Sequence, residues 1–179
     1  MTPAATRSGP LAAALAIVAL ALAGCAPTGS TATQAAGTSP PASADQVVFQ
    51  AELTSDYSKT YPVGASDSKV FGVNILAGNT KINGEKVRVE VLGTVDYEAG
   101  SGPFGSFLAL QWPDGSVLGV QLEGQATQDS ATEATGFDAE LTVIDGSGKA
   151  EGITGSGSFA GSRAGPLATA IDIEVALDL

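Results

Sequence analysis

Apolar residues recur at every second position through most of the chain after residue 45. In one segment Val87, Val89 and Val91 alternate with charged residues, and over 171–177 four apolar residues alternate with acidic ones and one alanine. A period of two is typical of a β-strand with one buried face, because successive side chains point to opposite faces of a sheet. The pattern predicts about eight strands, over 47–53, 70–75, 87–97, 107–112, 117–122, 137–144, 150–159 and 171–177.

Short turn motifs separate these segments. Asn83-Gly84, Asp114-Gly115 and Asp145-Gly146 each lie beside an alternating run. Pairs of this kind favour tight hairpins, because both residue types tolerate positive φ. Short connections without helical crossovers indicate an antiparallel sheet, so the expected fold class is all-β, either a barrel or a sandwich. Closure into a barrel of about eight strands is favoured, because it removes exposed strand edges.

Two stretches between the predicted strands, 55–68 and 124–136, are longer than hairpin turns. Loops of this length in a small domain often carry a functional site or form an insertion. The first stretch holds Tyr57 and Tyr61, for which the two interpretations are the rim of a pocket and plain packing. Together with Tyr97, they are the candidate ligand-binding residues.

The first 24 residues have the organisation of an export signal. Arg7 precedes a 12-residue apolar run, 11–22, which as a helix would cover about 18 Å, less than a hydrocarbon core of about 30 Å. The run ends in Leu-Ala-Gly-Cys, with Cys25 the chain's one cysteine. This ending resembles the lipobox of bacterial lipoproteins. The resemblance implies a diacylglyceryl group on Cys25 and cleavage before it; the alternatives are an ordinary secretory signal and a buried free thiol.

The segment 25–45 is expected to be a disordered tether. Residues 26–44 are rich in alanine, threonine, proline, serine and glycine, and none of them is charged or aromatic. Such a segment cannot bury enough apolar surface to offset its chain entropy. The predicted organisation is therefore a signal peptide (1–24), a lipidated cysteine with its tether (25–45) and a barrel domain (46–179). The predicted location is the extracytoplasmic face of a bacterial cell membrane.

Composition excludes several functions. The chain has no histidine and one cysteine, so neither a Ser-His-Asp nucleophile nor an imidazole metal site nor an internal disulfide can form. The 19 acidic residues outnumber 8 basic ones, for a net charge of −11, and this excess disfavours binding to nucleic-acid phosphates. We expect no metal, no cofactor and no nucleic-acid partner.

The segment 143–159, with glycines at 146, 148, 152, 155 and 157, resembles the glycine-rich run of the allene oxide cyclase and dirigent superfamily. In that superfamily the run joins two late strands of an eight-stranded antiparallel barrel, and the resemblance here extends over 100–179. Physically, glycine permits positive φ and sharp strand bends. Gly146, Gly148, Gly155 and Gly157 are therefore expected to form turns at a barrel corner.

Two functions follow from these observations. The favoured one is a non-enzymatic cell-envelope lipoprotein, held at the membrane by its lipid, whose barrel binds a small apolar ligand or a partner protein. The alternative, implied by the resemblance, is an isomerase or cyclase acting on an apolar substrate inside the barrel. In that case Tyr57, Tyr61, Tyr97 or Glu90 would project into the cavity.

Overall fold

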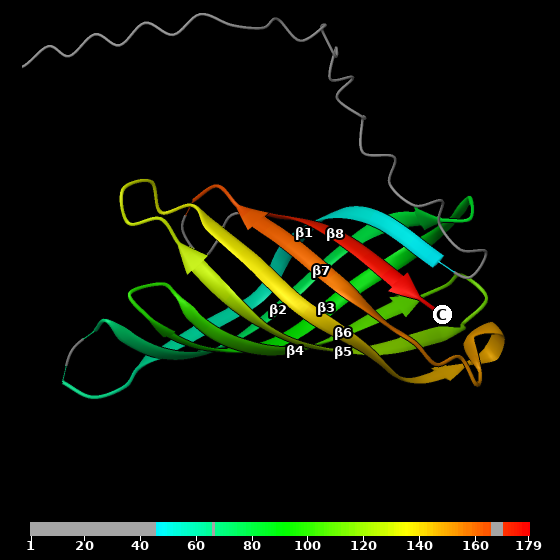
Figure 1. The fold of residues 1–179 in the computed structure, drawn as a ribbon, viewed down its shortest axis with the longest axis horizontal. Helices are drawn as coiled ribbons and strands as arrows, with labels where there is room; N and C mark the ends of the chain where they lie inside the picture. The colour runs from blue at the N-terminus through cyan, green and yellow to red at the C-terminus, as the bar shows by residue number, and fades with distance from the viewer. Residues whose placement is uncertain (1–45, 66, 166–169) are drawn as a thin grey trace, which may run out of the picture. The chain divides into compact units, whose positions relative to one another are not determined.

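The domain is a closed barrel of eight antiparallel strands, as expected (Figure 1). The computed structural model describes residues 46–65, 67–165 and 170–179. Within the described ranges, no helix is long and apolar enough to cross a membrane. The predicted signal, tether and Cys25 lie outside the described residues.

The strands are β1 (Gln46–Pro62), β2 (Lys69–Ile82), β3 (Glu85–Glu98), β4 (Gly102–Gln111), β5 (Val117–Gln128), β6 (Thr135–Ser147), β7 (Ser156–Arg163) and β8 (Ile171–Asp178), with a 3₁₀ turn, η1 (Gly148–Ala150), before β7.

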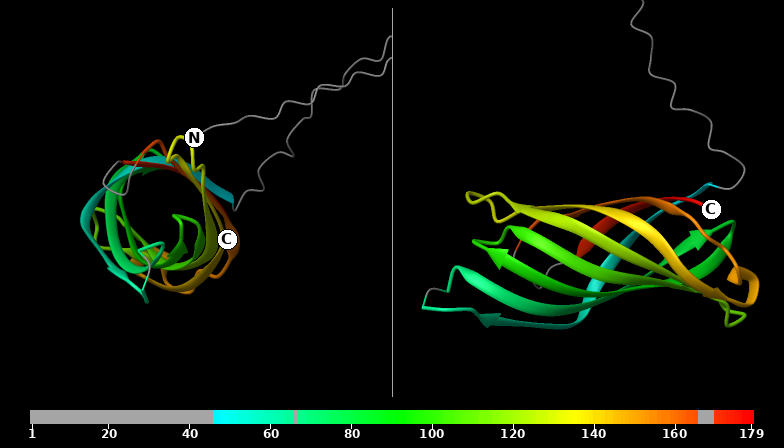
Figure 2. Two further views of the ribbon diagram at one scale, coloured as in Figure 1. Left: turned by 90° about the vertical axis from the view of Figure 1, so that its left-hand side faces the viewer. Right: turned by 60° about the horizontal axis from the view of Figure 1, so that its bottom comes forward.

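Each strand pairs with its neighbour in sequence, and β1 pairs with β8 to close the sheet. The closing ladder runs from Gln46 opposite Asp178 to Leu53 opposite Ile171. An end-on view and an oblique view show the resulting ring of tilted strands (Figure 2). Because every strand has two partners, no long edge is left free to pair with another chain.

The alternating pattern places one face of each strand inside. Val87, Val89 and Leu108 are fully buried, as are Leu122 and Val175. Side chains at intervening positions face solvent, and many of these are acidic. Each fully buried leucine or valine contributes about 1.5–3 kcal/mol by leaving water, so the inward rows supply the main driving force for closure.

The Asn83-Gly84 turn joins β2 to β3 as predicted. Both residues have positive φ, 52° for Asn83 and 83° for Gly84. This combination is the one that a two-residue hairpin turn requires, since its twist matches the twist of the flanking strands.

Several boundaries differ from the sequence-based expectation. β2 continues to Ile82, where the expected strand ended at 75, and β4 begins at Gly102, where it was expected to begin at 107. β1 continues to Pro62 and β5 to Gln128, so much of the two expected loops is strand. The expected strand over 150–159 begins at Ser156, because residues 148–150 form η1. Polar, glycine-rich strands near the barrel ends lack the apolar alternation that identifies a strand in sequence, although their backbones still complete the ladder.

Candidate functional site

A pocket lies at each end of the barrel. We call the end that carries residues 99–101 and 129–134 the Arg163 end, and the end that carries Asn83, Asp114 and η1 the Lys149 end. The left panel of Figure 2 looks along the barrel from the Arg163 end. Beneath this end lies a cavity of about 60 Å³, which is the candidate functional site.

The cavity has mainly apolar walls with a few polar groups. All eight strands contribute side chains that line it. Its apolar wall includes Leu76, Val91, Val95, Phe104, Phe137 and Ile171. Its polar groups are Ser58, Thr60, Asn74, Tyr97, Ser106 and Arg163. Ser58 and Thr60 are also exposed to solvent, so they mark the place where the cavity meets the outside.

Tyr97 reaches the cavity because it continues the inward row of β3, which begins with the buried Val87 and Val89. Its side chain is 4% exposed. Burial raises the pKa of the Tyr97 hydroxyl from 10.0 to about 12, against the opposing effect of the positive charge on Arg163. The hydroxyl is therefore protonated at neutral pH and available as a hydrogen-bond donor.

Arg163 lies at the end of β7 and is 4% exposed. Its Nη2 donates a hydrogen bond to Thr135 Oγ1 (3.0 Å), and its Nε donates to the carbonyl of Gly165 (2.8 Å). The guanidinium carbon lies 5.6 Å from the centre of the Phe137 ring, which is itself in edge-to-face contact with Phe104. Burial lowers the pKa of the Arg163 guanidinium, and its interaction with Tyr97 opposes that change. An arginine nevertheless stays charged in a protein.

Arg163 is the site residue that sequence reasoning missed. The sequence feature that could have revealed it is the alternation in β7. Gly157, Phe159 and Gly161 occupy the inward-facing positions before Arg163, at every second residue. The row is hard to recognise because two of its members are glycines.

Tyr57 and Tyr61 lie on the outer face, 48% and 47% exposed, and do not reach the cavity. The reason is a β-bulge in β1 between Ser55 and Tyr57. Asp56 is the extra residue, and one extra residue moves every later side chain to the opposite face. Tyr61 instead lies beneath Lys59, whose Nζ is 4.9 Å from the ring centre.

Glu90, the fourth expected cavity residue, also faces outward. Gln111 Nε2 donates a hydrogen bond to its carboxylate (3.4 Å), and Arg88 lies 3.6 Å from it. Of the four side chains expected to project into the cavity, Tyr97 is therefore the one that does so.

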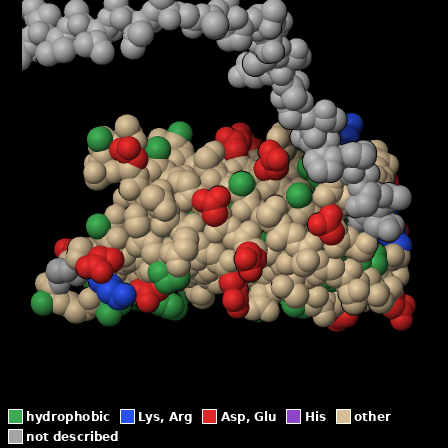
Figure 3. Space-filling model, viewed as in Figure 1, with side chains coloured by type: hydrophobic (Ala, Val, Ile, Leu, Met, Phe, Trp, Pro, Cys, Tyr) green, Lys and Arg blue, Asp and Glu red, His purple; other side chains and the backbone are tan. Residues whose placement is uncertain are grey.

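The outer surface carries two contrasting regions. Tyr57, Ile75, Leu92 and Phe107 are cross-strand neighbours and form an apolar strip over β1–β4. Acidic side chains are spread over the face viewed in Figure 3, to which outward positions of β5–β8 contribute. The acidic positions are Glu123, Asp138, Glu140, Asp172 and Glu174. In the described part of the chain, no three acidic or cysteine side chains converge as a metal site.

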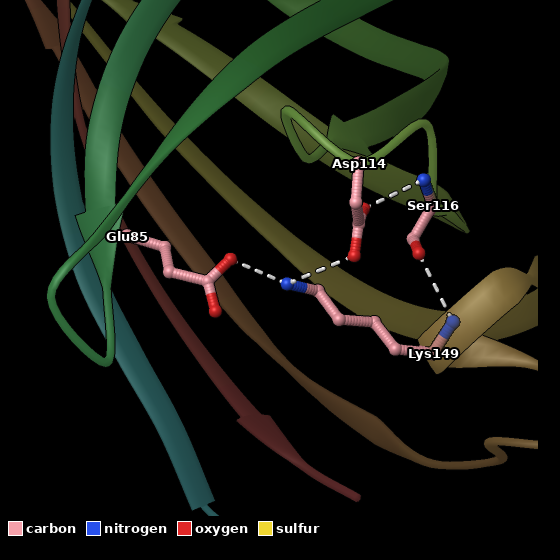
Figure 4. A network of polar contacts seen from close by, with 4 residues as sticks. All are labelled: Glu85, Asp114, Ser116 and Lys149. Carbon is pink, nitrogen blue, oxygen red and sulfur yellow. Dashed lines mark hydrogen bonds and ion pairs between the residues drawn. The ribbon is translucent and has the colours of Figure 1, made fainter.

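The Lys149 end carries a network of polar contacts (Figure 4), beside a second pocket of about 220 Å³ that Lys149 helps to line. Lys149 Nζ lies between the carboxylates of Glu85 and Asp114, 3.6 Å from the latter. The Lys149 backbone N–H donates to Ser116 Oγ (3.0 Å), and the Ser116 N–H donates to Asp114 Oδ1 (2.9 Å). The hydrogen bond to Glu85 raises the pKa of Lys149, whereas the Ser116 N–H lowers that of Asp114. Because these charges are mutually paired, the network stabilises the turn conformation at this end.

The glycine-rich turn of η1 lies beside this network. Gly148 has a φ of 62°, a conformation that favours glycine. At Gly146, Gly155 and Gly157 a Cβ atom would collide with a neighbouring backbone carbonyl. These four glycines permit a close approach of backbone segments near the Lys149 end, away from the cavity.

Comparison with known protein families and with curated proteins finds no match. Among solved structures, the fold is similar to the crystal structure of RPA1785, a conserved protein of unknown function from Rhodopseudomonas palustris. The TM-score is 0.52 at 15% sequence identity, over 74% of this chain and 95% of that chain. At this identity the similarity shows a shared eight-stranded antiparallel barrel and assigns no family.

Proposed function

We propose that this protein is a cell-envelope lipoprotein whose barrel binds a small, mainly apolar molecule at the Arg163 end, without catalysing a reaction. The observation that carries the proposal is the cavity, in which apolar walls and a few polar groups surround a space of about 60 Å³. Pockets for small molecules combine an apolar lining with a few polar groups that orient the ligand. Fully buried side chains pack the interior below the cavity and hold its walls in place.

The size of the cavity limits what it can hold. One water molecule needs about 10–15 Å³ of such space, so the cavity has room for a short aliphatic group or a few waters. A longer molecule would extend past Ser58 and Thr60 into solvent. We therefore expect a small or slender ligand.

The anchoring part of the proposal rests on the N-terminal sequence. Two or more acyl chains on Cys25 would hold the protein stably at a membrane, whereas a single chain binds only marginally. A tether of about 20 residues would span roughly 25 Å as a flexible coil, which would let the barrel sample the space next to the membrane.

The binding proposal is tested by titrating the protein with 1-hexanol and with hexanoate and following backbone amide signals by NMR. We expect at least one probe to shift the signals of Leu76, Val91 and Tyr97. Val95→Phe, which extends a ring into the cavity, should abolish these shifts. Thr94→Phe, its outward-facing neighbour on β3, is the matched control and should leave them intact. The proposal fails if neither probe binds, or if a folded Val95→Phe variant binds as well as the wild type.

The second candidate function is that of an isomerase or cyclase of the allene oxide cyclase type, acting on an apolar substrate. The observation that favours it is the protonated Tyr97 hydroxyl beside Arg163 in the cavity wall, since such a hydroxyl is a potential proton donor. Turnover of an apolar epoxide by the purified protein, lost in Tyr97→Phe, would favour catalysis over simple binding.

A further inference from the structure

Arg163 is a buried positive charge that has no acidic partner among the described residues. Its side chain is 4% exposed. The ion pairs found among the described residues join other side chains, and none includes Arg163. Its two hydrogen-bond acceptors, the Thr135 hydroxyl and the Gly165 carbonyl, are both neutral. A charge in this environment loses hydration that neutral acceptors replace only in part.

The guanidinium also has unused donors. Arginine carries five N–H groups, and Nη1 makes no hydrogen bond to any described residue. Because Arg163 lines the cavity, its guanidinium can offer a donor to a molecule bound there.

The surroundings favour a carboxylate as the group that binds there. A guanidinium matches the planar geometry of a carboxylate, and the resulting charge-assisted hydrogen bonds are about twice as strong as neutral ones. Tyr97 and Arg163 are the two ionisable side chains in the cavity wall, so one negative charge is the most that the site balances. The protonated Tyr97 hydroxyl can act as a second donor.

The positions of these residues also orient the ligand. Tyr97 lies near the end of β3, Arg163 ends β7, and Thr135 begins β6, so the polar groups lie towards the rim. Leu53, Leu122 and other fully buried side chains form the apolar floor. A molecule with a charged head at the rim and an aliphatic tail directed inward would satisfy both parts.

We propose that the natural ligand is a short aliphatic monocarboxylate, with its carboxylate on Arg163 and its tail in the apolar part of the cavity. This inference rests on the binding function proposed above. The net charge of −11 opposes the approach of an anion. Surface charges are screened over about 8 Å at physiological ionic strength, however, and the contact with Arg163 is short-range.

The test compares hexanoate, 1-hexanol and hexylamine, which have the same tail and different heads, by calorimetric titration of the full-length protein at pH 7. We expect hexanoate to bind at least about tenfold more tightly than the other two. In Arg163→Met, hexanoate should weaken to the level of 1-hexanol, whose own affinity should not change. Arg88→Met, which removes an exposed arginine on the outer face of β3, is the matched control and should bind like the wild type.

The possible results separate this inference from the function on which it rests. If 1-hexanol or hexylamine binds the wild type as tightly as hexanoate, the carboxylate inference is overturned while the binding function stands. The same holds if folded Arg163→Met keeps its preference for hexanoate. If no probe binds, both proposals are overturned. The wild-type comparison decides the matter even if Arg163→Met does not fold.

Discussion

Tyr97 and Arg163 come from opposite parts of the ring of strands and meet at the rim of the cavity. Each is 4% exposed, and each affects the pKa of the other. Ionising Tyr97 would place a phenolate in an apolar wall, where desolvation outweighs the attraction of Arg163. The protein therefore holds Tyr97 in its neutral form. As a result, the free energy of unfolding depends on pH in the alkaline range.

The stability of the protein should fall between about pH 10 and pH 12. The pKa of Tyr97 is about 12 in the folded state and 10.0 without the fold. Above pH 10 the unfolded chain loses this proton first, so each rise in pH favours unfolding. The contribution of Tyr97 is fully present below pH 10, and its loss across this range is on the order of 2–3 kcal/mol. Urea unfolding at a series of pH values measures this loss of stability.

Tyr97→Phe should lose much less stability over the same range, because phenylalanine has no proton to release. Tyr57→Phe is the control, since Tyr57 is 48% exposed, and it should retain the alkaline loss seen in the wild type. A Tyr97→Phe variant that loses stability as steeply as the wild type would show that other groups account for the effect.

At the scale of elements, two local backbone features determine how strands of the barrel are joined and oriented. The Asn83-Gly84 turn lets β2 reverse into β3 within two residues, and it depends on positive φ at both positions. The bulge at Asp56 adds one residue to β1 and thereby sends Tyr57 and Tyr61 outward. Both features act through the backbone, independently of apolar burial.

The turn is tested by Gly84→Ala, with Gly136→Ala as its matched control. A Cβ atom would meet no neighbour within 4 Å at either position, but only Gly84 has a positive φ (83°). We expect Gly84→Ala to lower the free energy of unfolding by about 1 kcal/mol, because alanine is strained in this conformation. Gly136→Ala should be neutral or slightly stabilising. Equal losses in urea unfolding would mean that backbone conformation is not the cause.

At the scale of the whole molecule, the proposed function combines a lipid anchor, a tether and a binding barrel. The strongest single element of this arrangement is Cys25, which lies at the one position where the sequence resembles a lipobox. In this proposed arrangement, membrane attachment depends on that thiol and not on the acidic barrel surface.

Bacterial cells made to express the wild-type chain should incorporate radiolabelled palmitate into the protein and retain it in the membrane fraction. Cys25→Ser should abolish the label and shift the protein out of that fraction, because serine cannot accept the diacylglyceryl group as a thioether. Ala26→Ser, one residue beyond, should keep both properties. Label on Cys25→Ser equal to that on the wild type would contradict the anchor.

The sequence alone was enough to predict the class of fold and the inward face of several strands. In β3 and β8 apolar residues alternate with charged ones, and Val89 and Ile173 are buried as this alternation requires. This succeeds because a period of two is a local property of an extended chain, and burying one face follows from it. Closure into a barrel was also predictable, from short turns and the cost of free edges.

The candidate site depended on tertiary structure. Arg163 and Thr135 are 28 residues apart, and Tyr97 is more distant still, so only the closed ring brings them to one cavity. The bulge at Asp56 reversed the facing of two tyrosines by inserting one residue that no sequence pattern marks. Local periodicity in the sequence thus determines which residues face inward. Register and closure of the sheet determine which of these residues come together, because both depend on pairing between strands that are far apart in the chain.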